Sequence, residues 1–194
     1  MADTANFAKS FVKLKKWVLG AAVILVSLLM LFSKELVHVF LAGEYNQARY
    51  LIPIVAFSCV FSSLGGYYSY CLLVKKQTGM MSVISIGTAG TNVVLNIILI
   101  PKYGIYAAAI TTVFSYLLSY MVYTIVAAKT LRIILRVRED LYAFSTLGAA
   151  YFISFLLSET PIIISIPVKS LVFILIFFLQ AQDIVKSERT PAAL

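Results

Sequence analysis

The residues of this chain that could do chemistry are mostly amides and hydroxyls, not acids, bases or nucleophiles. Asn92 and Asn96 stand out because they lie one helical turn apart inside a strongly apolar stretch. In lipid an amide side chain must find a partner, so this helix face points into protein or into a wet cavity. One interpretation is hydrogen bonding between helices, and the other is contact with a substrate that passes along this face.

Signatures of enzymes are absent from the sequence. No Gly-x-x-x-x-Gly-Lys-Ser/Thr loop could cradle phosphates, and no Gly-x-Ser-x-Gly turn could present a nucleophile. The single histidine, His38, rules out a site with several histidine ligands. We therefore expect no catalytic residue, no metal site and no cofactor. The acidic residues all fall in tails, loops or helix ends, so no ion-coupling carboxylate is predicted inside a span.

Composition places the chain in a bilayer. Of its 194 residues 61% are hydrophobic and 12% are charged, and the mean hydropathy is +0.96. Soluble domains carry about twice that share of charge. The net charge of +8 could suggest nucleic acid, but the basic residues fall between apolar runs, which is the pattern of a membrane protein. The expected partners are membrane lipids, with no nucleic acid.

The apolar runs are continuous, which predicts helices because only helices and closed barrels satisfy every backbone group in lipid. We predict an all-α bundle of six transmembrane helices over residues 17–186, after an amphipathic cytoplasmic segment at 1–16 and before a tail at 187–194. The expected spans are Lys16–Phe32, Tyr50–Val74, Gly79–Ile100, Gly104–Ala127, Leu141–Leu157 and Val168–Val185.

Short connections and basic residues predict the topology. Pro101 is expected to end one helix, because the residue before a proline resists the α conformation, and Gly104 to start the next. Of 16 basic residues, all but Lys34, Arg49, Lys102 and Lys169 fall on one side of the predicted spans. The positive-inside rule then puts both termini in the cytoplasm. To keep Lys169 out of lipid, the last helix is expected to begin near Pro167, after an outer loop over 158–166.

Two further groups of residues are candidates for packing or binding. Small residues recur at helical spacing after the predicted turn and suit close helix packing: Gly104, Ala108, Thr112, Ser115 and Ser119. Arg49 starts the second span and could hold phosphate oxygens with its forked donors. The alternative for Arg49 is an interfacial arginine that reaches water and pairs with Glu44 or Glu35.

A resemblance to a known family rests on "LNIILIPKYGIYAAAITTVFSY". It resembles the polysaccharide flippases of the multidrug/oligosaccharidyl-lipid/polysaccharide exporter superfamily, in which an Asn and a Leu-Asn precede Pro-Lys-Tyr-Gly and Ile-x-Gly-Ala-Ala. Here Ala107 replaces the glycine of that last motif. The upstream "ELVHVFLAGEYNQARYLIPI" and "LLVKKQTGMMSVISI" are also similar to family segments, so the resemblance covers about residues 20–130.

The resemblance implies one lobe of a two-lobe transporter in the bacterial cytoplasmic (inner) membrane. Its substrate would be a lipid-linked oligosaccharide or polysaccharide precursor, moved by alternating access with no bond made or broken. The chain would be the C-terminal lobe, and an N-terminal six-helix lobe would be its missing partner. Arg49, Asn92 and Asn96 are the candidates for the substrate path. The alternatives are half of a multidrug-type exporter, a membrane remnant that does not transport, and a membrane enzyme of surface-polysaccharide assembly.

Overall fold

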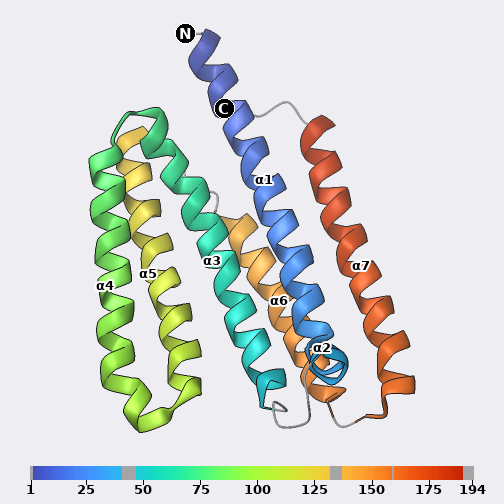
Figure 1. Cartoon of the computed structure of the whole chain (residues 1–194). Coiled ribbons are helices and arrows are strands. Elements are labelled where there is room, and N and C mark those ends of the chain that lie inside the picture. Colours follow the sequence, from blue (N-terminus) through green and yellow to red (C-terminus); the bar gives the residue numbers. More distant parts are fainter. Residues whose placement is uncertain (1, 41–46, 132–136, 159, 190–194) are drawn as a thin grey trace.

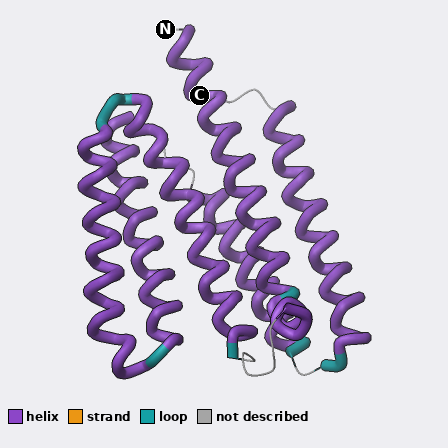
Figure 2. Tube along the Cα trace, viewed as in Figure 1, coloured by secondary structure: helices purple, strands orange, loops and turns teal. Residues whose placement is uncertain are grey.

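The computed structural model describes residues 2–40, 47–131, 137–158 and 160–189, and these residues are almost entirely helical. Six of the described helices are long, and one short helix follows the first of them. Their bounds are α1 Ala2–Leu31, α2 Ser33–Phe40, α3 Ala48–Val74, α4 Thr78–Tyr103, α5 Ile105–Leu131, α6 Val137–Leu156 and α7 Ile162–Arg189. Figure 2 shows that the described loops are confined to the two ends of the bundle.

The long helices run up and down between two ends of the molecule. The beginning of α1, the turn between α3 and α4, and the end of α7 lie at one end, here called the N-terminal end (Figure 1). The short helix α2, the turn between α4 and α5, and the turn before α7 lie at the opposite end, here called the α2 end (Figure 1). This arrangement agrees with the antiparallel hairpins predicted from the short connections.

Helix α1 lies between α3, α6 and α7, while the α4–α5 hairpin stands to one side and packs on α3 through α5 (Figure 1). The helices differ in how much of them is buried. Half of the apolar 18-residue segment of α1 and of α3 is buried, against 6% of the corresponding segment of α4. Helix α4 packs mainly on α5 and to a lesser extent on α3.

Five helices are long and apolar enough to cross a membrane: α1, α3, α4, α5 and α7. The apolar part of α6, Asp140–Leu156, is shorter than a full span. The exposed surface of the bundle is rich in large apolar side chains, among them Ile97 on α4 and Leu171 on α7. Such a surface suits hydrocarbon, so the described residues form a multi-pass membrane helix bundle.

Two apolar clusters fill the bundle interior. One joins α1, α3, α6 and α7 around Val23, Val60 and Leu147. The other lies nearer the N-terminal end and is aromatic, with Phe11 stacked on Tyr67 at 4.3 Å between ring centroids. Close approach of α3 to α5 occurs at Gly65, where an added Cβ would lie 3.7 Å from the backbone of Tyr120.

Two predicted boundaries were wrong. Pro101 does not end its helix, because it lies in the last turn of α4, which ends at Tyr103. Gly104 follows as the C-cap, and its positive φ of 62° favours glycine. The last helix begins at Ile162, so Pro167 lies inside α7 and residues 162–166, expected in the outer loop, are helical. Membrane helices tolerate proline because neighbouring groups satisfy the freed carbonyl. The segment from Ser33 to Phe40, which lies between the first two predicted spans, is the helix α2.

Candidate functional site

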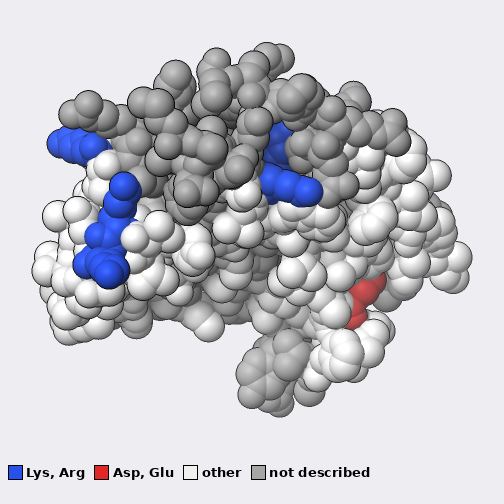
Figure 3. Space-filling view, turned by 90° about the horizontal axis from the view of Figure 1, so that it is seen from above, with Lys and Arg blue, Asp and Glu red and all other residues white. Residues whose placement is uncertain are grey.

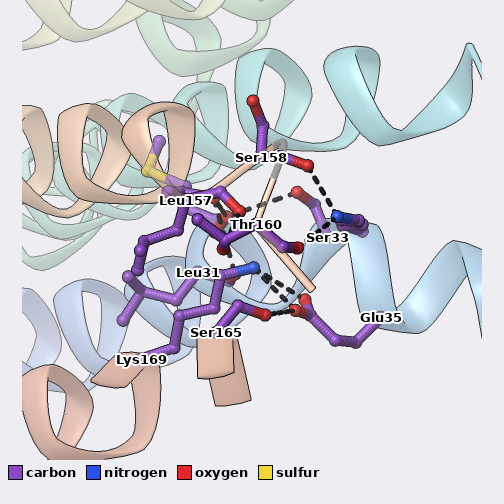
Figure 4. Close-up of polar contacts among 11 residues, drawn as sticks. Leu31, Ser33, Glu35, Leu157, Ser158, Thr160, Ser165 and Lys169 are labelled. Atoms are coloured by element: carbon purple, nitrogen blue, oxygen red, sulfur yellow. Dashed lines mark hydrogen bonds and ion pairs between the residues drawn. The ribbon is translucent and has the colours of Figure 1, made fainter. Parts of the chain in front are cut away.

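A buried ion pair at the α2 end joins α2 to α7 (Figure 4). Lys169 Nζ donates to Glu35 Oε1 at 2.7 Å and to Glu35 Oε2 at 2.9 Å, and the Ser165 hydroxyl donates to Oε1 at 3.0 Å. The Lys169 side chain is fully buried. Lys169 and Ser165 lie one turn apart on α7, so a single helix face supplies both donors.

The Glu35 carboxylate is held in its charged form. Burial alone would raise its pKa, but several favourable contacts with the anion outweigh that effect. These are the hydrogen bond from Lys169, a backbone hydrogen bond at Glu35 itself, the charge of Lys169 and the hydrogen bond from Ser165. Together they leave the pKa of Glu35 below its usual value. The Glu35 carboxyl group is therefore ionised at neutral pH.

A second lysine ties α2 to the turn between α6 and α7. Lys34 Nζ donates to the carbonyl oxygens of Ser158 at 2.6 Å and Thr160 at 3.0 Å (Figure 4). Beside it the Ser154 hydroxyl on α6 donates to the Met30 carbonyl at 2.8 Å. Carbonyl groups at the end of a helix have no intrahelical partner, so a cation there is favourable. These contacts fix α2 across the end of the bundle.

A second buried ion pair lies toward the N-terminal end. Lys15 Nζ on α1 is 2.8 Å from Asp140 Oδ1 on α6, and both side chains are almost completely buried. Tyr120 on α5 donates its hydroxyl to Asp140 Oδ2 at 3.0 Å, and the Lys15 ammonium lies 5.8 Å from the ring centre of Tyr68 on α3. Four helices meet at this cluster.

The burial of these two ion pairs was not predicted from the sequence. Lys15 was assigned to the amphipathic cytoplasmic segment at 1–16, and it is only 4% exposed. Glu35 and Asp140 lie near helix starts, in agreement with the expectation of loops or helix ends, but Asp140 is only 1% exposed. Nothing in the sequence pairs residues so far apart. The available signal was the conflict at Lys169, a lysine inside an apolar run, which required a carboxylate partner.

Asn92 and Asn96 face α5 and form a polar ladder with it. Asn92 Nδ2 donates to Ser115 Oγ at 3.1 Å, and Asn96 Nδ2 donates to Asn92 Oδ1 at 3.0 Å. The Thr111 hydroxyl donates to Asn96 Oδ1, and the Ser115 hydroxyl donates to the Thr111 carbonyl at 2.8 Å. The ladder lies inside both apolar spans. The bonds from Asn92 to Ser115 and from Thr111 to Asn96 join α4 to α5, which is the first of the two roles expected for the amides.

The small residues expected to pack are placed in different ways. Ser115 is buried, while Ala108, Thr112 and Ser119 are half-buried on α5. The Ala108 carbonyl accepts hydrogen bonds from the hydroxyls of Thr111 and Thr112. Gly104 is exposed in the turn, and no atom lies within 4 Å of where its Cβ would be. Gly104 therefore serves the turn, and helix packing begins further along α5.

Arg49 lies in the first turn of α3 at the α2 end. Its guanidinium donates to the Tyr50 hydroxyl and lies 4.6 Å from the centre of the Tyr50 ring. The expected alternative partner Glu35 is bound to Lys169, and Glu44 lies outside the described residues. Arg49 thus lies at the start of α3, whereas Asn92 and Asn96 bind α5 from α4. None of the hydrogen bonds described here joins Arg49 to the two amides, so these contacts do not bring the three candidates for the substrate path together.

Exposed basic side chains gather at the N-terminal end. Figure 3 looks onto this end and shows basic side chains at separate places on it. The exposed lysines of the described part here include Lys13, Lys75, Lys76 and Lys129. These lysines belong to the group of basic residues from which the positive-inside rule predicts that this end faces the cytoplasm. Within the described residues, no three metal-ligating side chains come together.

Known proteins add nothing to this geometry. Comparison with protein families, with curated proteins and with solved structures found no match.

Proposed function

We propose that the chain forms one six-helix lobe of an alternating-access flippase in the bacterial cytoplasmic membrane. The substrate is a lipid-linked oligosaccharide or polysaccharide precursor, and a second lobe of six helices completes the transporter. Support for this substrate class comes from the resemblance around Asn96 and Pro101-Lys102-Tyr103-Gly104. Both termini of the lobe lie in the cytoplasm, and transport proceeds by rocking of the lobes without covalent chemistry.

The observation that carries the proposal is the pair of buried ion pairs at the two ends of one bundle. Lys15 and Asp140 join α1 to α6, and Glu35 and Lys169 join α2 to α7. Charges inside a membrane bundle are costly, so by default they indicate function. Here one pair holds the central helix α1 against α6, and the other holds the short helix α2 against α7. A lobe held in this way moves as one body, which rocking against a second lobe requires.

Half of a multidrug-type exporter is the second candidate, because such an exporter is expected to carry a buried carboxylate. Glu35 and Asp140 are both buried carboxylates. Each is neutralised by a lysine within 3 Å, however, so a coupling cation would have to displace that lysine first. We therefore favour the flippase, in which Glu35 and Asp140 with their lysine partners stabilise the packing of the lobe.

The test is deletion of the coding region from its host, followed by measurement of surface glycan and of drug resistance. The flippase predicts loss of surface glycan with accumulation of the lipid-linked precursor, restored by the wild-type gene. Lower drug resistance with normal surface glycan would favour the exporter. Normal behaviour in both assays would leave a membrane remnant that does not transport. Loss of glycan without precursor accumulation would indicate an enzyme of glycan assembly.

A further inference from the structure

A crevice lies between α1, α6 and α7, toward the N-terminal end of the bundle. Helices α6 and α7 both pack on α1 but contact each other much less. The buried residues Leu19 and Gly20 of α1 line the crevice, and so do Tyr142 of α6 and Asp183 of α7, which are exposed. The crevice therefore has α1 as its floor and opens between α6 and α7, toward the surroundings of the bundle.

The crevice lies at the level of lipid headgroups along these helices. Lys16 is near the start of the apolar span of α1, and Asp183 is near the end of that of α7. Tyr142 is near the start of the shorter apolar part of α6. Tyrosines and long charged side chains at the ends of membrane helices meet the headgroup region. A phospholipid beside the bundle would therefore present its headgroup to the crevice and its chains to the apolar helix surfaces further along the span.

A buried amide in the crevice lacks a partner. Gln180 on α7 lines the crevice and is 6% exposed, and its Nε2 atom has no hydrogen-bond partner among the described residues. Burial of a donor without a partner is costly, and rotation about the last bond of the side chain can turn this nitrogen toward the crevice. The crevice has a volume of about 20 Å³, which admits one small polar group. The amide is thus placed to bind one polar group of a ligand whose remainder lies outside.

Two opposite charges accompany this amide. Lys16 of α1 and Asp183 of α7 both line the crevice, and neither of the two buried ion pairs described above includes Asp183. Lys16 has a further interaction of its own, but an ammonium has three donors and can also bind an anion. The carboxylate of Asp183 only accepts hydrogen bonds. The crevice therefore offers donors to an anion and an acceptor to a cation at the same place.

We propose that the crevice binds the headgroup of phosphatidylethanolamine, a phospholipid whose phosphate and primary ammonium carry opposite charges. The phosphate accepts hydrogen bonds from Lys16 and Gln180, and the ammonium donates to Asp183. Phosphatidylglycerol has no cation for Asp183, and the ammonium of phosphatidylcholine has no N–H group to donate. The charges of the crevice thus select one class of headgroup. The site requires only that the chain spans a membrane, so it goes beyond the proposed transport function and does not rest on it.

The experiment measures lipid binding to the purified full-length chain by native mass spectrometry in detergent. The probes are phosphatidylethanolamine, phosphatidylglycerol and phosphatidylcholine with identical acyl chains, so that only the headgroups differ. We expect phosphatidylethanolamine to bind about tenfold more tightly than either of the others, since one hydrogen bond between charged groups accounts for a difference of about that size. An equal or higher affinity for phosphatidylglycerol or phosphatidylcholine would overturn the proposal.

Variants locate the headgroup. Asp183→Asn removes the acceptor of the ammonium at an exposed position, so the bundle should keep its fold. It should bind phosphatidylethanolamine about tenfold more weakly and lose the preference over phosphatidylglycerol. Gln180→Leu replaces the amide by an apolar side chain and should weaken the binding of both lipids about tenfold. The matched control is Lys75→Gln, which changes the net charge by the same amount at an exposed position outside the crevice and should alter neither affinity nor preference.

The variants can also reject the site. Wild-type affinity for phosphatidylethanolamine in either Asp183→Asn or Gln180→Leu would overturn it, and Asp183→Asn alone decides if Gln180→Leu does not fold. A loss of preference in Lys75→Gln as large as that in Asp183→Asn would show a general effect of net charge and would also overturn the site. Because lipid selectivity is measured on the purified chain, its outcome is separate from that of the glycan assay after gene deletion.

Discussion

Lys169 Nζ lies 2.7 Å from Glu35 Oε1, although 134 positions separate the two residues in the chain. The contact fixes the short helix α2 against the last long helix. It also explains how a lysine can lie inside an apolar run of α7, since its charge is neutralised and all contacts are internal.

Removing one partner of this pair should destabilise the bundle strongly. Lys169→Met leaves the Glu35 carboxylate buried without its cation, and loss of one partner of a buried pair costs about 3–5 kcal/mol. We expect a large drop in the melting temperature of the purified protein in detergent. The double variant Glu35→Leu with Lys169→Met should recover most of the loss, because apolar replacement of a whole pair is often neutral.

The control for this cycle is Lys102→Met, which removes an exposed lysine near the same end and should change stability little. A double variant as unstable as the sum of its two single variants would show that Glu35 and Lys169 act independently.

Acid should weaken the same contact. The pKa of Glu35 is lowered in the folded protein, so its contribution to stability is complete above the unfolded value of about 4.3. That contribution declines as the pH falls below this value and through the folded pKa. Melting curves between pH 7 and pH 3 should therefore show the wild type approaching Glu35→Gln as the pH falls. A constant difference between the two proteins over this range would contradict the assignment.

The long helices were predictable because each depends on its own apolar run. The burial of ionisable groups was not predictable, because it depends on which helices pack against one another. Lys169 was kept out of lipid by moving a helix boundary to Pro167, whereas the fold keeps it in the helix and supplies Glu35. The same holds for Lys15 and Asp140, whose partnership needs α1 and α6 to be neighbours.

Candidate site residues divide in the same way. Asn92 and Asn96 were recognisable from the sequence because amides in an apolar run need hydrogen-bond partners wherever they lie. Their partners, Ser115 and Thr111, could be identified only from the packing of α5 against α4. The short helix α2 was missed because its eight residues lack the length of a span. Its local signal was Glu35 in the first turn, which favours a helix start.

The packing of α3 on α5 should be disrupted by a larger side chain at Gly65 but not by one at the neighbouring Gly66. Gly65→Leu would push a side chain toward the backbone of Tyr120, while the Cβ of a residue at 66 would meet no atom within 4 Å. Overpacking costs about 1–3 kcal/mol, so Gly65→Leu should lower the yield and melting temperature of folded protein. Gly66→Leu is the matched control. Equal behaviour of both variants would show that α3 and α5 are not packed at this depth.

The topology predicts which turns reach the periplasm. The turn between α3 and α4 lies at the N-terminal end with Lys75 and Lys76, and the turn after Lys102 lies at the opposite end (Figure 1). Since the basic end is assigned to the cytoplasm, alkaline phosphatase fused after Lys102 should be active and after Lys76 inactive. The reverse pattern of activity would invert the assignment.

The polar ladder between α4 and α5 permits a test of its two roles. Asn96→Leu removes the acceptor of the Thr111 hydroxyl, and Asn92→Leu removes the donor to Ser115. Hydrogen bonds between membrane helices contribute about 0.6 kcal/mol on average, so each variant should lower the stability measurably but modestly. The effect should be visible because α4 has few other contacts within the chain.

Stability and transport together decide between the roles of Asn92 and Asn96. If the ladder is structural, melting temperature and glycan export should fall in proportion in the two single variants and further in the double variant. If the amides also meet the substrate, export should fall while the protein stays folded. The control is Ile97→Leu, an exposed apolar change on α4 that should affect neither measurement. Wild-type stability and export in the double variant would reject both roles, because an amide pair inside a span would then be dispensable.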